Sequence, residues 1–292
     1  MAYSKVFIEA VEKHLKFHRI IGDTLSISNR NLKSYVLKFQ EKANIYADGI
    51  IGPETLWELQ FPLVLSSKKL NWVRCEADKI VGIDGFNSFL FREDAAARYN
   101  LIRKEVLRLG GSITSSGGKR ELTANVNEYR SSKSMHYVGL AFDLSITSGF
   151  FDPQRDPFVI VENKIKSGPY WKVYCRAPGG DAMTLNAVYW ESWGSGITKK
   201  IEITGNFIDF TDLAGKHGFH PIPPRSGFLR GSNKKYLSSE WWHFQANDLL
   251  VPMFSQFGIE LLKIEDYSPQ YLKHVNSKIW NNKKVVYKQN WW

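Results

Sequence analysis

The pattern of apolar and polar positions predicts that the first sixty residues are helical. In residues 4–19 and 31–43, apolar side chains recur every three or four positions, which is the spacing of one helix face. Asp48-Gly49 is a turn signal, and Gly52-Pro53 predicts the start of a third helix, because proline suits the first helical position. Residues 61–70 contain a proline and a polar run, so we expect a linker there.

Beyond this linker, the pattern predicts helices among short strands that do not alternate regularly with them. One helix is expected from Asp94, acting as its cap, to Leu109, where Gly110-Gly111 follows, and another from Asp209 to Gly218. Strands are expected at residues 113–115, 138–146, 170–175 and 187–193, the last two forming a hairpin around a glycine-rich turn at 178–180. This order indicates an α+β domain with a small, mainly antiparallel sheet.

Four side chains in two distant segments have the chemistry of a zinc site. His136, Asp143 and His243 offer two imidazole nitrogens and a carboxylate, and a catalytic zinc ion takes three such ligands and leaves one position for water. Glu240, three residues before the last histidine, is a carboxylate that can accept a proton from water attacking a carbonyl. In a regular strand Glu240 and His243 would point to opposite faces, so we expect Glu240 at a strand end or bulge.

These segments resemble the zinc D-Ala-D-Ala carboxypeptidase/dipeptidase family. Ser134-Met-His136-Tyr-Val-Gly139-Leu-Ala141-Phe-Asp143 matches its pattern S-x-H-x-x-G-x-A-x-D, and Glu240-Trp-Trp-His243 is similar to its second motif. The family includes VanY-like carboxypeptidases and phage endolysins that cut the L-alanyl-D-glutamate bond of peptidoglycan. The resemblance covers about residues 72 to 262 and implies Zn²⁺ as cofactor and hydrolysis of a stem-peptide bond.

The resemblance also implies a positive group for the oxyanion, which the family supplies from an arginine upstream of the first motif. Arg120 occupies the corresponding place, but the match carries extra residues, so Lys119 and Arg130 remain alternatives. Ser134 is expected to orient a ligand or contact substrate, or else to hydrogen-bond a turn, and Trp242 is expected to contact substrate. The aromatic segment 170–193 is either a wall of the substrate groove or a plain hairpin.

The helical N-terminal segment resembles the three-helix peptidoglycan-binding module that accompanies many wall hydrolases. The resemblance rests on the Asp48-Gly49-Ile-Ile-Gly52-Pro53-Glu-Thr stretch, and a generic helical hairpin is the alternative. The expected domains are therefore a helical module over residues 1–62, a catalytic domain over 70–262 and a basic, aromatic tail over 263–292. The tail either binds anionic polymers or packs on its own domain.

Composition and charge limit the possible binding partners and the cellular location of the protein. The net charge of +10 indicates an anionic partner, and no nucleic-acid-reading motif accompanies it, so the cell envelope and its peptidoglycan are favoured. Two cysteines, Cys75 and Cys175, are expected to be buried free thiols. We expect no signal peptide or membrane span, a monomer, synthesis in the host cytoplasm and action on the wall after release, as for a phage endolysin.

Three interpretations of the function stay open. The first is an endopeptidase of the L-alanyl-D-glutamate type, and the second is a D-Ala-D-Ala carboxypeptidase. The third, from another class, is a non-catalytic wall-binding protein in which the zinc ion is structural. A wall-binding module favours the endopeptidase, because an enzyme that cuts a polymer gains from being held on it.

Overall fold

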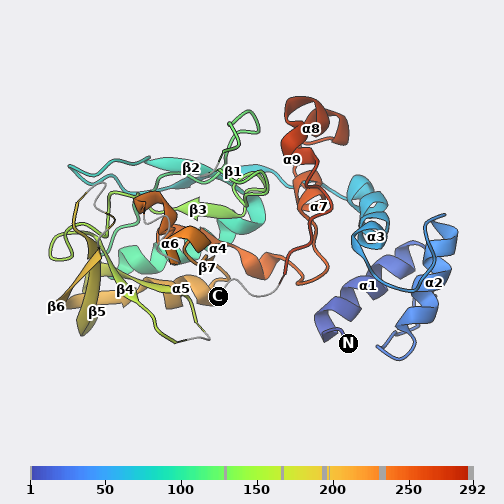
Figure 1. Cartoon of the computed structure of the whole chain (residues 1–292), viewed down its shortest axis with the longest axis horizontal. Helices are drawn as coiled ribbons and strands as arrows, with labels where there is room; N and C mark the ends of the chain where they lie inside the picture. Colours follow the sequence, from blue (N-terminus) through green and yellow to red (C-terminus); the bar gives the residue numbers. More distant parts are fainter. Residues whose placement is uncertain are drawn as a thin grey trace. The chain divides into compact units, whose positions relative to one another are not determined.

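The chain folds into two compact units and contains both helices and small antiparallel sheets, a mixture compatible with the predicted α+β class (Figure 1). The computed structural model describes residues 2–127, 130–165, 168–192, 196, 198–229 and 235–288. One unit comprises Met1–Asn71 together with Leu250–Gln289, and the other comprises Trp72–Leu249. In the described ranges, every helix is too short or too polar to traverse a lipid bilayer.

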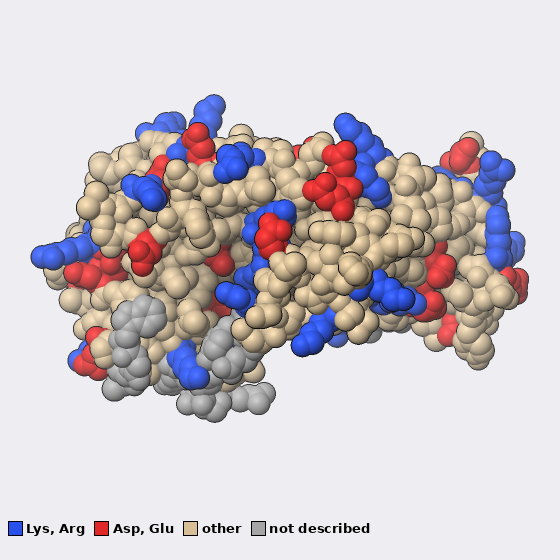
Figure 2. Space-filling view, turned by 90° about the horizontal axis from the view of Figure 1, so that it is seen from above, with Lys and Arg blue, Asp and Glu red and all other residues tan. Residues whose placement is uncertain are grey.

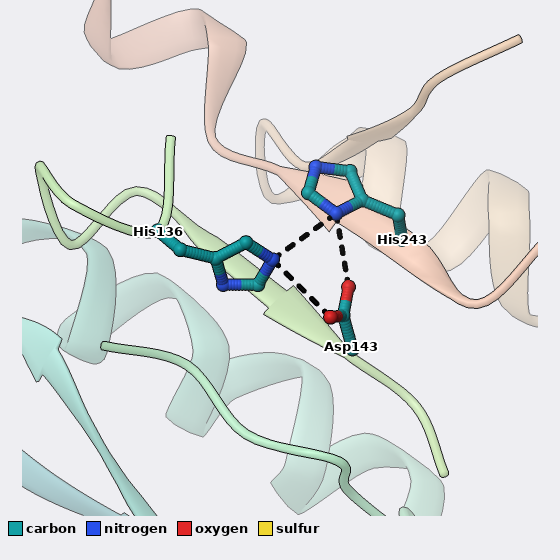
Figure 3. Close-up of side chains that lie close together, drawn as sticks. All are labelled: His136, Asp143 and His243. Atoms are coloured by element: carbon teal, nitrogen blue, oxygen red, sulfur yellow. Dashed lines mark hydrogen bonds and ion pairs between the residues drawn. The ribbon is translucent and has the colours of Figure 1, made fainter. Parts of the chain in front are cut away.

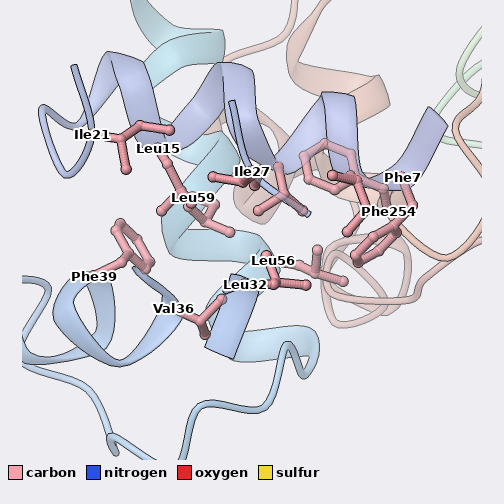
Figure 4. Packing of buried hydrophobic residues seen from close by; sticks show 12 residues of the cluster. Phe7, Leu15, Ile21, Ile27, Leu32, Val36, Phe39, Leu56, Leu59 and Phe254 are labelled. Carbon is pink, nitrogen blue, oxygen red and sulfur yellow. The ribbon is translucent and has the colours of Figure 1, made fainter. Parts of the chain in front are cut away.

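The first unit is helical, as the periodicity predicts. Its N-terminal helices are α1 (Lys5–Phe17), α2 (Leu32–Lys42) and α3 (Pro53–Ser66), and its C-terminal helices are α7 (Phe257–Leu262), α8 (Pro269–Val275) and α9 (Ser277–Trp280). Ser4 caps α1 by accepting a hydrogen bond from the Phe7 amide, and Pro53 occupies the first turn of α3. The apolar faces of α1, α2 and α3 meet in one core (Figure 4).

The predicted linker at 61–70 is wrong in its first part, because α3 continues through Pro62 to Ser66. A proline inside a helix removes one backbone hydrogen bond, and the buried Leu59 and Val64 on either side supply packing that offsets the loss. The chain then pairs with the C-terminal segment: the Leu70 amide donates to the Lys263 carbonyl over 2.7 Å. Residues 61–70 therefore belong to the first unit.

The C-terminal segment shares the core of the N-terminal helices. Phe254 is 4% exposed within the same apolar cluster as Phe7 and Leu56. The side-chain amide of Gln60 donates to the Phe254 carbonyl, and that of Gln256 donates to the Pro53 carbonyl, over 3.0 and 2.9 Å. The structural units thus differ from the expected ranges 1–62, 70–262 and 263–292: residues 250–289 group with the first helices, and contacts this distant in sequence leave no local signal.

The second unit contains three small sheets whose strands are all antiparallel. They are β1 (Trp72–Glu76) with β2 (Ser88–Arg92); β3 (Ala141–Asp143), β8 (His243–Gln245) and β7 (His220–Pro221) in that order; and β4 (Phe158–Glu162), β5 (Trp171–Trp190) and β6 (Thr198–Asp209). The helical elements are α4 (Glu93–Arg108), α5 (Phe210–Lys216), α6 (Ser226–Leu229), η1 (Tyr236–Ser238) and η2 (Asn247–Leu249).

Both helices predicted in this unit form, but Asp94 does not cap α4. The N-cap is Arg92, and Asp94 lies in the first turn, where its carboxylate accepts from the Arg92 guanidinium over 2.8 Å. Gly110, with φ of +76°, follows the helix end. At α5, the Asp209 side chain caps the helix through the Asp212 amide, and Gly218 follows it with φ of +81°.

The strand predictions are less accurate. Residues 113–115 form no strand, and the strand expected over 138–146 is reduced to β3. The hairpin expected over 170–193 is wrong, because β5 runs as one strand and residues 177–180 form a bulge against β6. Gly180 fits this bulge because a Cβ would lie 2.5 Å from the Phe207 carbonyl oxygen.

Candidate metal centre

The small sheet of β3, β8 and β7 brings three side chains from the two motifs together (Figure 3). Asp143 ends β3 and pairs directly with His243, the first residue of β8, and His136 lies in the turns before β3. His136 Nε2 and His243 Nδ1 are 3.2 Å apart. Asp143 places one oxygen 3.2 Å from His136 Nε2 and the other 2.9 Å from His243 Nδ1. This group could hold a metal ion.

The outer nitrogen of each imidazole fixes the orientation of the ring. His136 Nδ1 donates to the Gly118 carbonyl oxygen over 2.6 Å, and His243 Nε2 donates to Gln245 Oε1 over 3.2 Å. Because both partners are acceptors, the inner nitrogen of each ring presents a lone pair when the ring is neutral. Gln245 is itself oriented, since its amide nitrogen donates to Asn247 Oδ1 over 2.9 Å.

With neutral rings, the inner nitrogens and the carboxylate oxygens all offer lone pairs, and such a set of ligand atoms suits a cation. When both rings are neutral, their inner nitrogens and the two oxygens of Asp143 direct lone pairs at one another, an arrangement that a positive ion between them stabilises. Two ligands about 2.0–2.1 Å from a tetrahedral zinc ion are separated by about 3.3 Å, close to the observed nitrogen–nitrogen distance. The three residues thus meet the requirements of a divalent metal site.

The charges of the group favour a positive partner for the Asp143 carboxylate. Burial alone would raise the pKa of the Asp143 carboxyl, but the neighbouring His136 and His243 rings outweigh burial and hold it well below its usual range. Burial alone would lower the pKa of His243, but its hydrogen bond to Asp143 and the charge of that carboxylate raise it, and the Glu240 carboxylate adds to the effect. Asp143 is thus ionised and supplies a full negative charge.

Glu240 lies outside the ligand group, three residues before the start of β8. The strand begins at His243, as the spacing argument required, and the His243 amide donates to the Glu240 carbonyl over 3.2 Å. Glu240 has φ of +54°, a left-handed conformation that costs a residue with a side chain about 1–3 kcal/mol. Its carboxylate accepts from Arg225 Nε over 2.7 Å.

The structure brings Arg120 and Ser134 together beside His136. Arg120 Nη1 donates to Ser134 Oγ over 3.2 Å, and the Arg120 amide donates to the His136 carbonyl over 3.2 Å. Of the two alternatives, Lys119 lies over the Trp72 ring at 4.8 Å and pairs with Glu121 at 3.2 Å, and Arg130 is exposed. Arg120 is therefore the cation of the three with a hydrogen bond to a residue of the first motif.

The other residues singled out in the two motifs, Trp242 and Gly139, are packed against neighbouring side chains and backbone. Trp242 is 5% exposed and stacks on Tyr236 with 5.5 Å between ring centroids, so its expected substrate contact stays a prediction. Gly139 has φ of +67°, and a Cβ there would lie 2.6 Å from the Trp72 ring and 2.8 Å from the Arg92 amide. This glycine is required by the close approach of β2 rather than by the ligands.

Histidine and cysteine residues outside the motifs take no part in the centre. His220 Nε2 lies 3.0 Å from Asp248 Oδ1, and neither His220 nor His217 belongs to the ligand group. Cys75 and Cys175 are buried free thiols, as expected, and burial raises the pKa of each.

Sequence reasoning missed two polar residues of this region. Gln245 lies two positions after His243 in β8, and strand alternation places such a residue on the same face, so the signal was present. Arg225 pairs with Glu240 from fifteen residues away in a segment of irregular structure, and no local pattern marks it.

A pocket of about 210 Å³ lies in the first unit at the Asp48-Gly49 turn. The buried Gln40 builds this turn: its Oε1 accepts from the Gly49 amide over 2.8 Å, and its Nε2 donates to Asp48 Oδ1 over 3.0 Å. Gly49 has φ of +73°, as the turn signal implies. The lining residues are Gln40, Ile45, Tyr46, Asp48, Ile50, Gly52, Pro53, Glu54 and Thr55. Tyr46 and Ile50 are 85% and 62% exposed, so the pocket has an apolar rim.

Comparison of the chain with protein-family models, with curated proteins and with solved structures finds no match. The interpretation of its function therefore rests on the residues of the chain itself.

Proposed function

We propose that this protein is a zinc-dependent peptidase of the bacterial cell wall that hydrolyses a peptide bond of the peptidoglycan stem peptide. The observation that carries the proposal is the group of His136, Asp143 and His243, whose ligand atoms converge within 4.8 Å of one another. Glu240 beside this group adds a carboxylate that a purely structural metal site does not need. The resemblance of both motifs to the zinc carboxypeptidase/dipeptidase family supports the same chemistry.

In this proposal His136, Asp143 and His243 hold the ion, which when bound supplies a Lewis acid for a carbonyl group and for water. Glu240 accepts a proton from the attacking water and returns it to the leaving amine. Arg120 stabilises the negative charge that develops on the carbonyl oxygen. Ser134, hydrogen-bonded to Arg120, orients that side chain.

We further propose that the first unit holds the enzyme on its polymeric substrate. The Asp48-Gly49 turn carries the resemblance to peptidoglycan-binding modules, and the pocket beside it has an exposed aromatic rim at Tyr46. Tethering raises the effective concentration of substrate at the catalytic unit. Such an arrangement favours an endopeptidase of the phage L-alanyl-D-glutamate type over a D-Ala-D-Ala carboxypeptidase.

The surface charge is compatible with an anionic wall and does not indicate a nucleic-acid groove. On the face drawn in Figure 2, Lys and Arg side chains lie among Asp and Glu, so the net charge of +10 is not gathered there into one basic stripe. A dispersed positive charge attracts a carboxylate-rich polymer without fixing one orientation.

Digestion of purified peptidoglycan by the zinc-loaded protein tests this proposal. We expect new amino termini in the stem peptide, identified by mass spectrometry, and their formation should be about 10² to 10⁴-fold slower with the Glu240→Gln variant. A new terminus at D-glutamate identifies the endopeptidase, and released D-alanine identifies the carboxypeptidase. If neither product forms under zinc-loaded conditions, the catalytic proposal is wrong. Binding to the wall without cleavage would then favour the alternative interpretation, a non-catalytic wall-binding protein with a structural metal.

A further inference from the structure

Arg225 is the one ion partner of Glu240 in the described part of the chain. Its Nε donates to Glu240 Oε1 over 2.7 Å, and the two side chains are 33% and 11% exposed. Hydrogen bonds between a guanidinium and a carboxylate are about twice as strong as neutral ones and are directional. This partly buried pair therefore restricts the orientation of the Glu240 carboxylate.

The backbone on both sides of Glu240 is held by other bonds. The Ser239 carbonyl accepts from the Trp171 indole over 2.8 Å, and the Trp241 indole donates to the Tyr236 hydroxyl over 3.1 Å. The Arg225 amide also donates to the Ser238 carbonyl over 2.9 Å. These contacts support the left-handed conformation of Glu240, because a strained residue persists where its surroundings fix it.

With the backbone fixed, the torsion angles of the Glu240 side chain are the remaining freedom. A glutamate loses considerable rotamer entropy when it is fixed, so a free Glu240 would sample several positions of its carboxylate. The bond to Arg225 engages Oε1, and Oε2 has no hydrogen-bond partner among the residues that the structure describes. One oxygen is thus anchored, and the other remains to exchange a proton.

We propose that Arg225 is a positioning residue that holds the Glu240 carboxylate in its working orientation. This inference rests on the proposed function, because it gives Arg225 a role only through the proton transfer by Glu240. Arginine suits the role better than lysine, since its planar guanidinium fixes direction as well as distance. Displacement of a catalytic group by about 1 Å can reduce the rate about 100-fold.

The test compares Arg225→Met, Arg225→Lys and the wild type in the zinc-loaded full chain, with a soluble stem-peptide fragment as substrate. We expect Arg225→Met to lower kcat by about 10- to 100-fold with KM nearly unchanged, because ground-state binding does not need Glu240. Arg225→Lys should recover part of kcat. Both variants should keep the zinc content of the wild type, since Arg225 is not a ligand.

Arg103→Met is the matched control. Arg103 Nη2 pairs with Asp78 at 2.7 Å, and these side chains are 19% and 21% exposed, so the control removes a comparable ion pair in the same unit. It should lower the melting temperature without changing kcat per folded molecule. If Arg225→Met folds poorly, Arg225→Lys and Arg225→Gln at a temperature where they are folded give the same comparison.

The outcomes separate this inference from the function on which it rests. An unchanged kcat in every folded Arg225 variant overturns the positioning role while the active wild type leaves the peptidase intact. A rise in KM with kcat unchanged also overturns it, because Arg225 would then contact substrate. A zinc-loaded wild type without activity on any stem peptide refutes the peptidase, and the positioning role fails with it.

Discussion

The two units bury their side chains for different physical reasons. The core of the first unit is apolar, formed by residues such as Val11 and Leu59, and its burial stabilises the fold. The second unit gathers His136, Asp143 and His243, whose ligand atoms lie within 4.8 Å of one another, and burying such polar groups costs free energy unless a proton or a cation pairs them. Burial in the first unit thus contributes stability, whereas the polar group in the second unit could hold a metal ion.

The largest effect should come from the ligands of the second unit. We expect His136→Ala, Asp143→Ala or His243→Ala each to remove most of the zinc and all measurable hydrolysis, because two remaining ligands leave the shell incomplete. Metal analysis of the purified variants and peptide cleavage provide the measurement. His220→Ala is the control, since the His220–Asp248 pair at 3.0 Å lies outside the group. Full zinc in all three ligand variants would contradict the assignment.

The next effect belongs to the core of the first unit. Phe254→Ala should destabilise that unit by about 3–5 kcal/mol, because the lost ring leaves a cavity among Phe7, His14 and their neighbours. Denaturant unfolding gives the free energy, and metal analysis tests whether the second unit is affected. A change below 1 kcal/mol would mean that the C-terminal segment is not part of this core. The hypothesis of a separate C-terminal tail would then be favoured again.

A smaller, pH-dependent effect is expected at His14, which is half-buried and lies near Lys13, His18 and Lys263. Burial lowers the pKa of His14 to about 4, below its ordinary value of 6.5. The unfolded chain therefore binds the proton more tightly, and the free energy of unfolding decreases as the pH falls from 6.5 towards 4. The loss is at most about 3.5 kcal/mol, since the pKa falls from 6.5 to about 4 and one pKa unit corresponds to about 1.4 kcal/mol.

The variant His14→Gln isolates this contribution from that of the carboxylates. The difference in unfolding free energy between wild type and variant, measured between pH 4 and 7.5, should change over this range and become constant below pH 4. A difference that does not vary with pH would show that His14 is solvated in the folded protein.

The smallest effect concerns the support of a ligand. Gln245→Ala removes the acceptor of His243 Nε2, and the loss of such a partner typically weakens metal binding about 10- to 100-fold. Zinc affinity measured by competition with a chelator should show this decrease, and the variant should still hold one zinc ion at saturation. An unchanged affinity would mean that the ring orientation of His243 is fixed by other contacts.

Structural features that depend on neighbouring residues could be predicted from the sequence. Helices α1 to α5 follow from periodicity, caps and glycine stops, and the ligand group follows from residue types whose chemistry leaves few alternatives. Glu240 could be expected at a strand end or a bulge, because strand alternation would otherwise point Glu240 and His243 to opposite faces.

Features that depend on distant parts of the chain could not be predicted. The pairing of Gln60 with Phe254 spans 194 residues, and a helical pattern does not reveal which other segment covers its apolar face. A glycine-rich stretch such as 178–180 suits both a hairpin turn and a bulge, and the choice depends on the continuous pairing of β5 with β6. The Arg225–Glu240 pair joins two irregular segments and leaves no periodic signal.

The central claim is that Glu240 transfers a proton at a metal site that other residues hold. The direct measurement determines zinc content and turnover on the same samples of wild type and Glu240→Gln. We predict that the variant retains its zinc while kcat falls by about 10² to 10⁴-fold, the usual contribution of general acid–base catalysis. Near-normal turnover in a zinc-loaded Glu240→Gln protein, or loss of zinc together with activity, would contradict this account.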